Sequence, residues 1–169
     1  MISIAAARNP EDFSAVAVLC RALGEWDSRE APNYGVPPEL VMELYHSHDE
    51  AEIVSRYSTD DARIYLARWD GAPAGCVAVA PFNADTLEVE KFYVDTAFRG
   101  KGVGRALMGE LLDDAEKSGC SRILIHTTIY MSSAVNIYRS LGFAECAQFR
   151  DVPASVVHSE IFMSRPLGA

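Results

Sequence analysis

The sequence predicts a mixed α/β fold in which helices flank one central sheet. Residues 63–82 fit a β-hairpin, because two strand-forming runs are joined by the turn sequence DGAP. A strand pattern at 87–94, a helix pattern at 104–117 and an apolar strand pattern at 122–128 follow in that order. Two strands separated by a helix favour parallel pairing. The sheet is therefore expected to be antiparallel in its N-terminal part and partly parallel in its C-terminal part.

The N-terminal third is predicted to contain one strand and two helices. Residues 2–7 form a short strand, and a helix with one apolar face begins near Pro10. Gly24 is expected to end this helix, and the segment EWDSREAPNYGVPP after it is expected to be a loop. A second helix is predicted over roughly 38–57, where the pattern is compatible with a break near His48.

The strand at 87–94 is expected to be regular, with alternate side chains on opposite faces of the sheet. Its polar face is then predicted to carry Glu88, Glu90, Phe92 and Val94. After residue 128, a short helix capped by Ser132 or Ser133 is expected to end at Gly142. Two further strands, near 143–149 and 156–163, complete the predicted sheet.

Composition indicates a single globular domain over residues 1–169. The chain is 49% hydrophobic and 23% charged, and it is long enough to bury its own core. A net charge of −9 argues against nucleic acid as a partner, because phosphate binding needs a basic face. No signal peptide, membrane-spanning stretch or metal-binding cysteine spacing is present, so we expect a cytoplasmic protein with no membrane partner and no metal.

Residues 98–106, FRGKGVGRA, concentrate glycine and positive charge at one strand-to-helix junction. The N-terminus of a helix exposes unpaired N–H groups and a partial positive charge. Glycines before it let the backbone approach a ligand closely, and Arg99, Lys101 and Arg105 add charge. The junction therefore predicts a cradle for an anion, best suited to a phosphorylated ligand.

Two common phosphate-binding motifs do not fit this junction. A Walker loop requires GxxxxGK followed by Ser or Thr, which is absent here. The dinucleotide fingerprint GxGxxG fails as well, because its last position is Arg105 when counted from Gly100 and Leu107 when counted from Gly102. What remains is the pattern Arg-x-x-Gly-x-Gly.

This pattern, formed by Arg99, Gly102 and Gly104, resembles the pyrophosphate loop of the GNAT (Gcn5-related) N-acetyltransferases, which bind acetyl-coenzyme A. The segment SSAVNIYRSLGF resembles the later A-x-x-x-Y-x-x-x-GF segment of that family, and LARWDGAPAGCVAV resembles its β-hairpin. The matches occur in the family's order over nearly the whole chain. The resemblance implies a GNAT-like mixed sheet and acetyl-coenzyme A as co-substrate.

In the family, the central strand parts from its parallel neighbour and exposes backbone groups beside the pantetheine arm. The resemblance implies that Phe92, Tyr93 and Val94 offer main-chain groups to this arm, and that the amide near Phe92 polarises the thioester carbonyl. The residues implied to wrap the diphosphate are Arg99, Gly100, Lys101, Gly102, Val103, Gly104, Arg105 and Ala106. Asn136 is a further candidate, although the family's frequent asparagine falls at Met131.

The same resemblance points to three catalytic candidates. Tyr138 is placed to protonate the departing thiolate, and packing on the apolar face of its helix is the alternative. Glu88 or Glu90 is a candidate for the base that deprotonates the amine, directly or through water. The alternative for both is a solvated strand face or an ion pair with Lys91 or Arg122.

The sequence also allows predictions for other polar residues of the N-terminal third. His46 and His48 are expected to be exposed, because residues two apart do not share a helix face. Trp26, Asp27 and Tyr34 lie in the predicted loop that lines the acceptor side in the family, and ordinary loop packing is their alternative role.

The resemblance therefore implies an N-acetyltransferase that moves an acetyl group from acetyl-coenzyme A to a primary amine of a small molecule or peptide. The amine is expected to attack directly in a ternary complex, because Cys76 and Cys120 fall outside the catalytic segments. A non-catalytic acyl-coenzyme A sensor or interaction module on the same fold is the alternative. A homodimer is compatible with the sequence, which contains no recognisable code for the acceptor.

Overall fold

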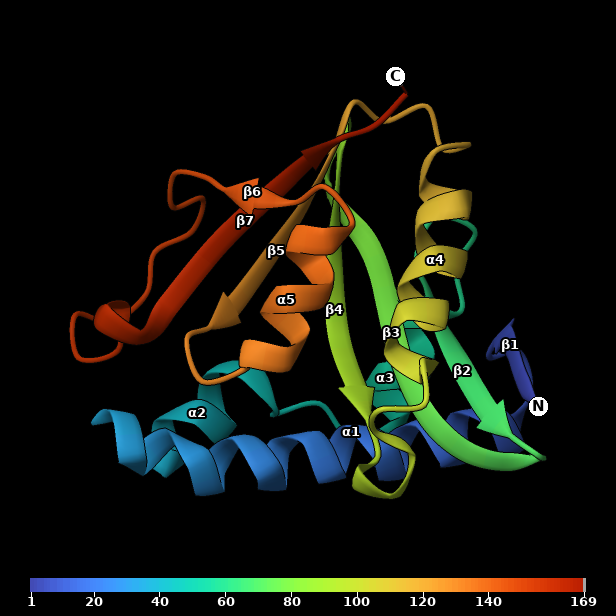
Figure 1. Ribbon diagram of the computed structural model, residues 1–169, viewed down its shortest axis with the longest axis horizontal. Helices are drawn as coiled ribbons and strands as arrows, with labels where there is room; N and C mark the ends of the chain where they lie inside the picture. Colours follow the sequence, from blue (N-terminus) through green and yellow to red (C-terminus); the bar gives the residue numbers. More distant parts are fainter. Residues whose placement is uncertain (169) are drawn as a thin grey trace.

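The computed structural model describes residues 1–168, which form one seven-stranded sheet in the order β1-β2-β3-β4-β5-β7-β6 (Figure 1). The strands are β1 (Ile2–Ala6), β2 (Arg63–Trp69), β3 (Ala72–Asn83), β4 (Thr86–Val94), β5 (Arg122–Thr128), β6 (Ala144–Glu145) and β7 (Glu160–Pro166). Within the described residues, β4 and β5 are parallel and the other neighbouring pairs are antiparallel. The predicted fold class is therefore confirmed.

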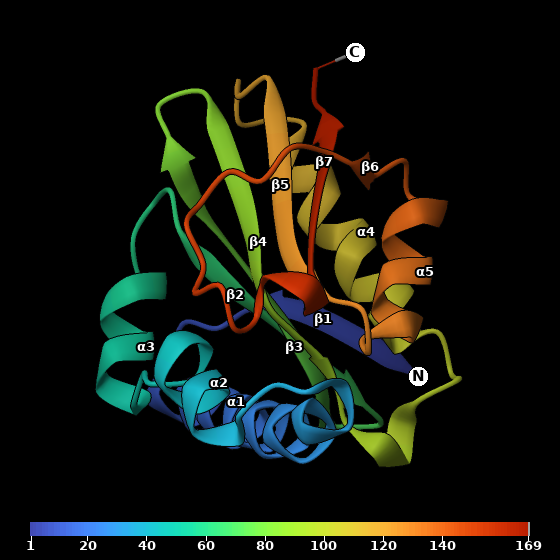
Figure 2. The same cartoon turned by 90° about the vertical axis from the view of Figure 1, so that its left-hand side faces the viewer.

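Helices cover both faces of this sheet (Figure 2). They are α1 (Pro10–Glu30), α2 (Pro38–Tyr45), α3 (Glu50–Tyr57), α4 (Val103–Ala115) and α5 (Ser132–Ser140). The core under α4 and α5 includes Leu107 and Val135, and the core under α1 and α3 includes Phe13 and Ile53. In residues 1–168 no helix has the length and apolar character needed to cross a bilayer.

The two parallel strands lie side by side over only part of β4. Pairing joins Thr86–Val89 of β4 to Arg122–Ile125 of β5, although β4 continues to Val94. Beyond Val89, the main-chain groups of β4 on the side of β5 have no partner in that strand. The structure thus has the parting of the central strand that the resemblance implies.

A β-bulge lies in β4 where the strands part. Lys91 has a φ of 54°, a left-handed conformation that is unusual for a residue with a side chain. The register with β3 shifts here, because Cys76 pairs with Tyr93 whereas Ala78 pairs with Glu90. One extra residue is therefore inserted into β4 between these two pairs.

The bulge reverses the alternation of side chains along β4. Val89 before the bulge and Phe92 after it both pack on the side of α4 and α5, whereas Tyr93 packs on the side of α1. The prediction that Glu88 and Glu90 share a face with Phe92 and Val94 is therefore wrong. That prediction assumed a regular strand, in which every second side chain lies on the same face of the sheet. One inserted residue moves the side chains that follow it to the opposite face.

The first helix is longer than predicted, because α1 continues through Gly24 to Glu30. Gly24 serves packing rather than termination, since a Cβ at this position would lie 3.2 Å from Cβ and Cγ of His46. Trp26 and Asp27 are therefore held in a helix and not in the predicted loop.

The predicted break in the second helical segment is confirmed. α2 ends at Tyr45 and α3 begins at Glu50. Asp49 caps α3 by accepting a hydrogen bond from the Glu52 amide, and the Glu52 carboxylate accepts one from the Asp49 amide.

The C-terminal strands differ from the prediction in extent. The strand expected near 143–149 is reduced to β6, and the strand expected near 156–163 begins only at Glu160. Val156, whose apolar side chain favoured a strand, instead packs in a small separate core with Ala31, Val36 and Tyr130.

The close approach of β3 and β4 beside the bulge allows a prediction about the stability of the protein. A Cβ added to Gly75 would lie 2.7 Å from the main-chain oxygen of Tyr93. Gly75→Ala is therefore expected to lower the free energy of unfolding by about 1–3 kcal/mol, measured by denaturant unfolding. Gly109→Ala in α4 is the matched control, because its Cβ meets nothing within 4 Å and its helix propensity improves. Equal stability of Gly75→Ala and the wild type would contradict this packing.

Candidate active site

The turn before α4 presents main-chain donors that the protein does not use. Gly100 and Gly102 have φ of 75° and 83°, values that glycine adopts without strain. Among residues 1–168, no hydrogen-bond acceptor is found for the amide N–H of any residue from Arg99 to Arg105. The Ala106 amide donates to the Gly102 carbonyl at 3.0 Å, so the first bonded turn of α4 starts there. The predicted anion cradle therefore has free donors.

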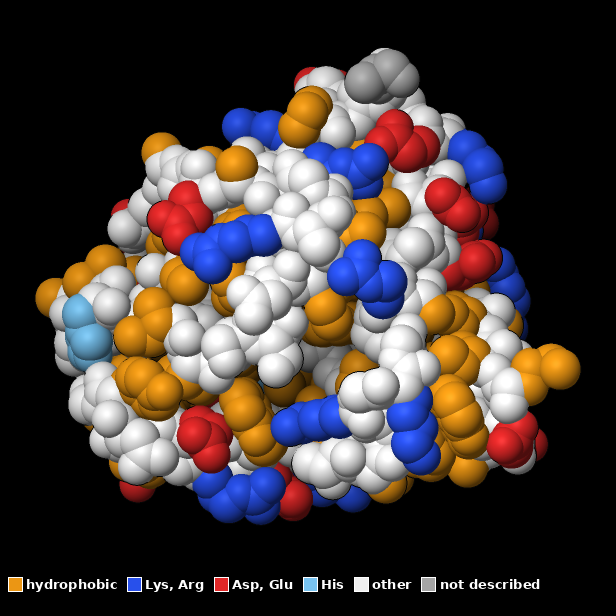
Figure 3. Space-filling model, viewed as in Figure 1, with side chains coloured by type: hydrophobic (Ala, Val, Ile, Leu, Met, Phe, Trp, Pro, Cys, Tyr) orange, Lys and Arg blue, Asp and Glu red, His pale blue; other side chains and the backbone are white. Residues whose placement is uncertain are grey.

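These donors border a cavity of about 410 Å³, here called the loop cavity, between the start of α4, the end of β4 and the start of α5. Of the residues predicted to bind the coenzyme, it is lined by Phe92, Tyr93, Val94, Arg99, Gly100, Gly102, Val103, Gly104 and Arg105. In the space-filling view, Lys and Arg side chains lie beside a hollow on this face (Figure 3). The loop cavity thus combines main-chain donors with positive charge.

Arg99 is held at the rim of the loop cavity. Its Nε donates to the Val94 carbonyl at 3.0 Å, and its guanidinium carbon lies 5.5 and 5.7 Å from the ring centres of Trp26 and Tyr93. A guanidinium group has five N–H donors, so most of them remain available to a bound anion.

Three of the predicted coenzyme-binding residues do not line the loop cavity. The Lys101 ammonium lies 5.2 and 5.5 Å from the ring centres of Trp69 and Phe98. The Ala106 amide is used inside α4, and Asn136 is exposed on α5. Spacing along the sequence could not separate these positions from their neighbours in the cradle.

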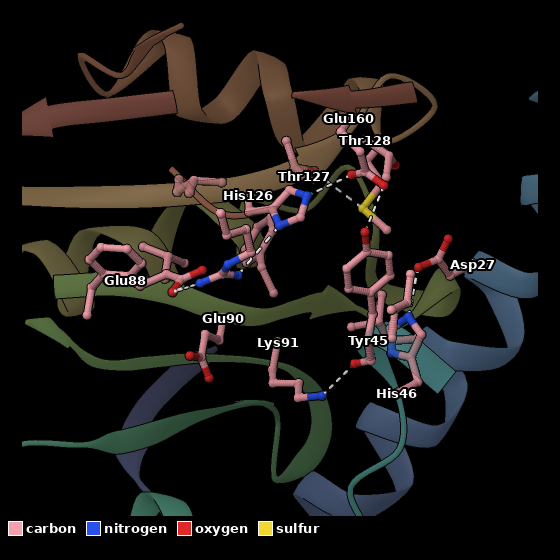
Figure 4. A pocket seen from close by; sticks show the side chains of 18 of the residues that line it. Asp27, Tyr45, His46, Glu88, Glu90, Lys91, His126, Thr127, Thr128 and Glu160 are labelled. Atoms are coloured by element: carbon pink, nitrogen blue, oxygen red, sulfur yellow. Dashed lines mark hydrogen bonds and ion pairs between the residues drawn. The ribbon is translucent and has the colours of Figure 1, made fainter. Parts of the chain in front are cut away.

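A second cavity of about 440 Å³, here called the sheet cavity, opens where β4 and β5 part. It is lined from β4 by Glu88, Glu90 and Lys91, from β5 by His126, and from α5 by Tyr138. Leu23, Phe92 and Met131 line both cavities, so the two meet at the parting of the strands. Figure 4 shows the polar side chains that converge on the sheet cavity.

The two candidate bases in the sheet cavity are both ion-paired, though not with Lys91 or Arg122. Glu88 accepts a hydrogen bond at Oε2 from Arg150 at 2.6 Å, and no partner is found for its Oε1 among the described residues. In Glu90, both oxygens are engaged, by Arg56 and by the Tyr57 hydroxyl.

The pKa of Glu90 reflects these contacts. Burial raises the pKa of this carboxyl, but the hydrogen bonds from Arg56 and Tyr57 and the nearby positive charges more than offset that effect and lower it overall. A carboxylate with a lowered pKa and no free oxygen is a poor proton acceptor. Of the two candidates, Glu88 is the one with a free oxygen.

The position of Tyr138 is compatible with both predictions made for it. Its ring packs in the core, 5.6 Å from the Phe92 ring and 6.0 Å from the Phe143 ring, and the residue is 4% exposed. Its hydroxyl has no hydrogen-bond partner among the described residues, and the side chain lines the sheet cavity. Burial raises the pKa of Tyr138 above its ordinary value of 10, so the phenol stays protonated at neutral pH.

Sequence reasoning missed a buried group around Asp27, a residue on α1 that is 2% exposed. Asp27 bonds His46 Nε2 at 2.7 Å and accepts a hydrogen bond from the Tyr130 hydroxyl. The prediction that His46 is exposed is therefore wrong, because α1 continues and covers it, whereas His48 is exposed as predicted. Tyr34 lines neither cavity.

A second such group surrounds Glu160 at the start of β7. Its carboxylate accepts a hydrogen bond from the Tyr45 hydroxyl at 2.8 Å and lies 2.8 Å from His126 Nε2. No spacing rule joins these three residues, which are far apart in the chain. Among residues 1–168, no cluster of three or more His, Cys, Asp or Glu side chains is arranged to hold a metal ion.

Comparison with known proteins agrees with this geometry. Residues 21–143 match the model of the acetyltransferase (GNAT) family. The IAA acetyltransferase of Azospirillum brasilense is 33% identical over 149 residues, which cover 83% of this chain and 96% of that protein. An uncharacterized N-acetyltransferase of Schizosaccharomyces pombe is 28% identical over 170 residues, which cover 97% and 96% of the two chains.

Solved structures show the same fold. The crystal structure of a GNAT-family acetyltransferase from Staphylococcus aureus superposes with a TM-score of 0.73 at 17% identity, over 99% of both chains. The segment that matches the family model includes most of the residues that line the two cavities. The chain therefore belongs to the acetyltransferase (GNAT) family and is an acyltransferase that uses an acyl-coenzyme A as co-substrate.

Proposed function

We propose that this protein transfers the acetyl group of acetyl-coenzyme A to a primary amine by direct attack in a ternary complex. The observation that carries the proposal is the meeting of two cavities at Phe92. One has free main-chain donors and positive charge, and the other has a carboxylate and a phenol. A donor in the loop cavity and an acceptor in the sheet cavity would meet at the parting of β4 and β5.

The loop cavity would hold the coenzyme. The free amides from Arg99 to Arg105 and the partial charge of the α4 N-terminus suit a diphosphate, which is doubly anionic. The unpaired main chain of β4 after Val89 would bind the amide groups of the pantetheine arm. The amide near Phe92 would then polarise the thioester carbonyl as negative charge develops on its oxygen.

Glu88 would accept the proton of the amine, directly or through a water molecule. An alkylammonium has a pKa of about 10 and must lose a proton before its nitrogen can attack. The nitrogen then bonds to the thioester carbon and the carbon–sulfur bond breaks, which leaves a thiolate. Tyr138, protonated and without a protein partner, would donate to that sulfur.

Substitution of Gly102 tests the cradle. Gly102→Val is expected to weaken acetyl-coenzyme A binding at least about tenfold, because a branched residue is strained at a φ of 83° and the free amides would move. Gly119→Val is the matched control, since Gly119 has a φ of 84° at the other end of α4. Equal dissociation constants for the two variants by calorimetry would count against the cradle.

Substitution of Tyr138 tests the acid. Tyr138→Phe is expected to lower kcat roughly 10²-fold with little change in acetyl-coenzyme A affinity. Because burial raises its pKa above the ordinary tyrosine value of 10, Tyr138 stays protonated up to that pH. Wild-type kcat is therefore not expected to decline between pH 7 and pH 10. Tyr65→Phe is the control, because the Tyr65 hydroxyl bonds Asp114 away from both cavities. Unchanged kcat in Tyr138→Phe would refute the role.

Comparison of the two glutamates separates a catalytic from a structural carboxylate. Glu88→Gln is expected to lower kcat, whereas Glu90→Gln is expected to lower stability. The folded-state pKa of Glu90 is depressed, so its stabilisation is present at neutral pH and is lost as pH falls below the ordinary value of 4.5. Unfolding followed from pH 7 to pH 3 measures this loss. A larger effect of Glu90→Gln than of Glu88→Gln on kcat would reverse the assignment.

Release of free thiol with a panel of primary amines tests the function as a whole. The proposed enzyme turns over in the presence of both substrates. A protein that binds acetyl-coenzyme A but releases no coenzyme A with any amine would be a sensor or interaction module rather than a catalyst.

A further inference from the structure

The sheet cavity contains one lysine or arginine side chain that forms no ion pair with a carboxylate of the described residues. Of its three basic side chains other than histidine, Arg150 pairs with Glu88 at 2.6 Å, and Arg56 pairs with Glu90. No carboxylate of the described residues lies within 4 Å of the Lys91 ammonium. Its Nζ donates to the main-chain oxygen of Tyr45 at 2.9 Å (Figure 4). An ammonium group has three donors, so two remain for another group.

The bulge in β4 brings Lys91 to this cavity. In a regular strand Lys91 would follow Leu87 and Val89 toward the core under α4 and α5, where a charged group would be costly. At a φ of 54° it instead lines the sheet cavity. Such a conformation is unfavourable for a residue other than glycine. The strained position therefore carries a side chain with unused donors, a combination that points to a ligand.

Two carboxylates that line the sheet cavity, Asp27 and Glu160, have no Lys or Arg partner among the described residues. Asp27 contacts His46 and Tyr130, and Glu160 contacts His126 and Tyr45. The side chains of Asp27 and Glu160 are 3% and 2% exposed. Buried carboxylates attract a cation that enters the cavity, because screening there is weak.

The unpaired ammonium of Lys91 and the carboxylates of Asp27 and Glu160 together favour a substrate that carries both a negative and a positive charge. We infer that the acceptor is an amino acid or a similar amine that carries a carboxylate, and that Lys91 binds this carboxylate. The charges of Asp27 and Glu160 would draw the ammonium group of the acceptor into the cavity, where Glu88 would accept the proton as proposed above. The inference rests on the proposed function and adds its substrate class. It makes Lys91 a specificity-determining residue for the reaction.

The test compares amino acids with their amides in wild type and Lys91→Met. An amino acid has the same groups as its amide, except that it carries a carboxylate in place of the neutral amide group. The two amines also differ in pKa, but this difference cancels when wild type and variant are compared with the same acceptor. Lys91→Met is expected to lower kcat/KM for the amino acids on the order of 10- to 100-fold, mainly through KM. For the amides the change is expected to be less than about threefold.

Two further variants complete the design. Lys91→Arg keeps the charge and is expected to restore most of the affinity for amino acids. Lys117→Met is the matched control, because the Lys117 side chain is 76% exposed and lines neither the loop cavity nor the sheet cavity. Thermal unfolding of each variant shows whether the substitution lowers the stability of the fold.

Each outcome decides one claim. Equal losses for amino acids and amides in Lys91→Met would overturn the inference and leave amine acetylation standing. If no amine is acetylated, calorimetric titration of the same amino acids and amides still decides the inference. Amino acids must then bind wild type more tightly than Lys91→Met, and amides must bind both alike; any other result overturns it.

Discussion

The arrangement of the site depends on the parting of β4 from β5 after Val89. Two parallel strands normally satisfy each other's main-chain groups along their length, and here that pairing stops after four residues of β4. The parting frees main-chain groups for a ligand and opens the sheet between its two helical layers. It thereby joins a cavity beside α4 to a cavity under α1 and α2. Without it, Phe92 would be an ordinary core residue and the two cavities would not meet.

The bulge at Lys91 then determines which side chains reach each cavity. Glu88 and Glu90 precede it and line the sheet cavity, while Phe92 follows it and packs against Tyr138 on the other face. A single inserted residue thus sets Glu88 and Phe92 on opposite faces of the sheet, beside the opening that Tyr138 of α5 also lines. Because arginines pair with Glu88 and Glu90, Lys91 is the lysine or arginine of the sheet cavity that has no carboxylate of the described residues within 4 Å.

Much of the fold could be predicted from local patterns, because hairpin turns, helix ends and strands depend on residues that are neighbours in the sequence. The glycine loop was recognisable for the same reason, since Arg99, Gly102 and Gly104 lie within six residues. The bulge was not recognisable, because Lys91 carries no glycine signal for its positive φ. The groups around Asp27 and Glu160 depend on contacts between distant segments, and Gly24 misled the helix boundary because its role is tertiary packing.

Amide hydrogen exchange with and without acetyl-coenzyme A tests the central claim most directly. In the free protein, the amides from Arg99 to Arg105 have no acceptor in the described structure, so they are expected to exchange rapidly. On saturation with acetyl-coenzyme A, these amides and those at the end of β4 are expected to become protected, while Gly119 beyond α4 does not change. Amides already protected in the free protein, or still unprotected when the ligand is bound, would contradict the account.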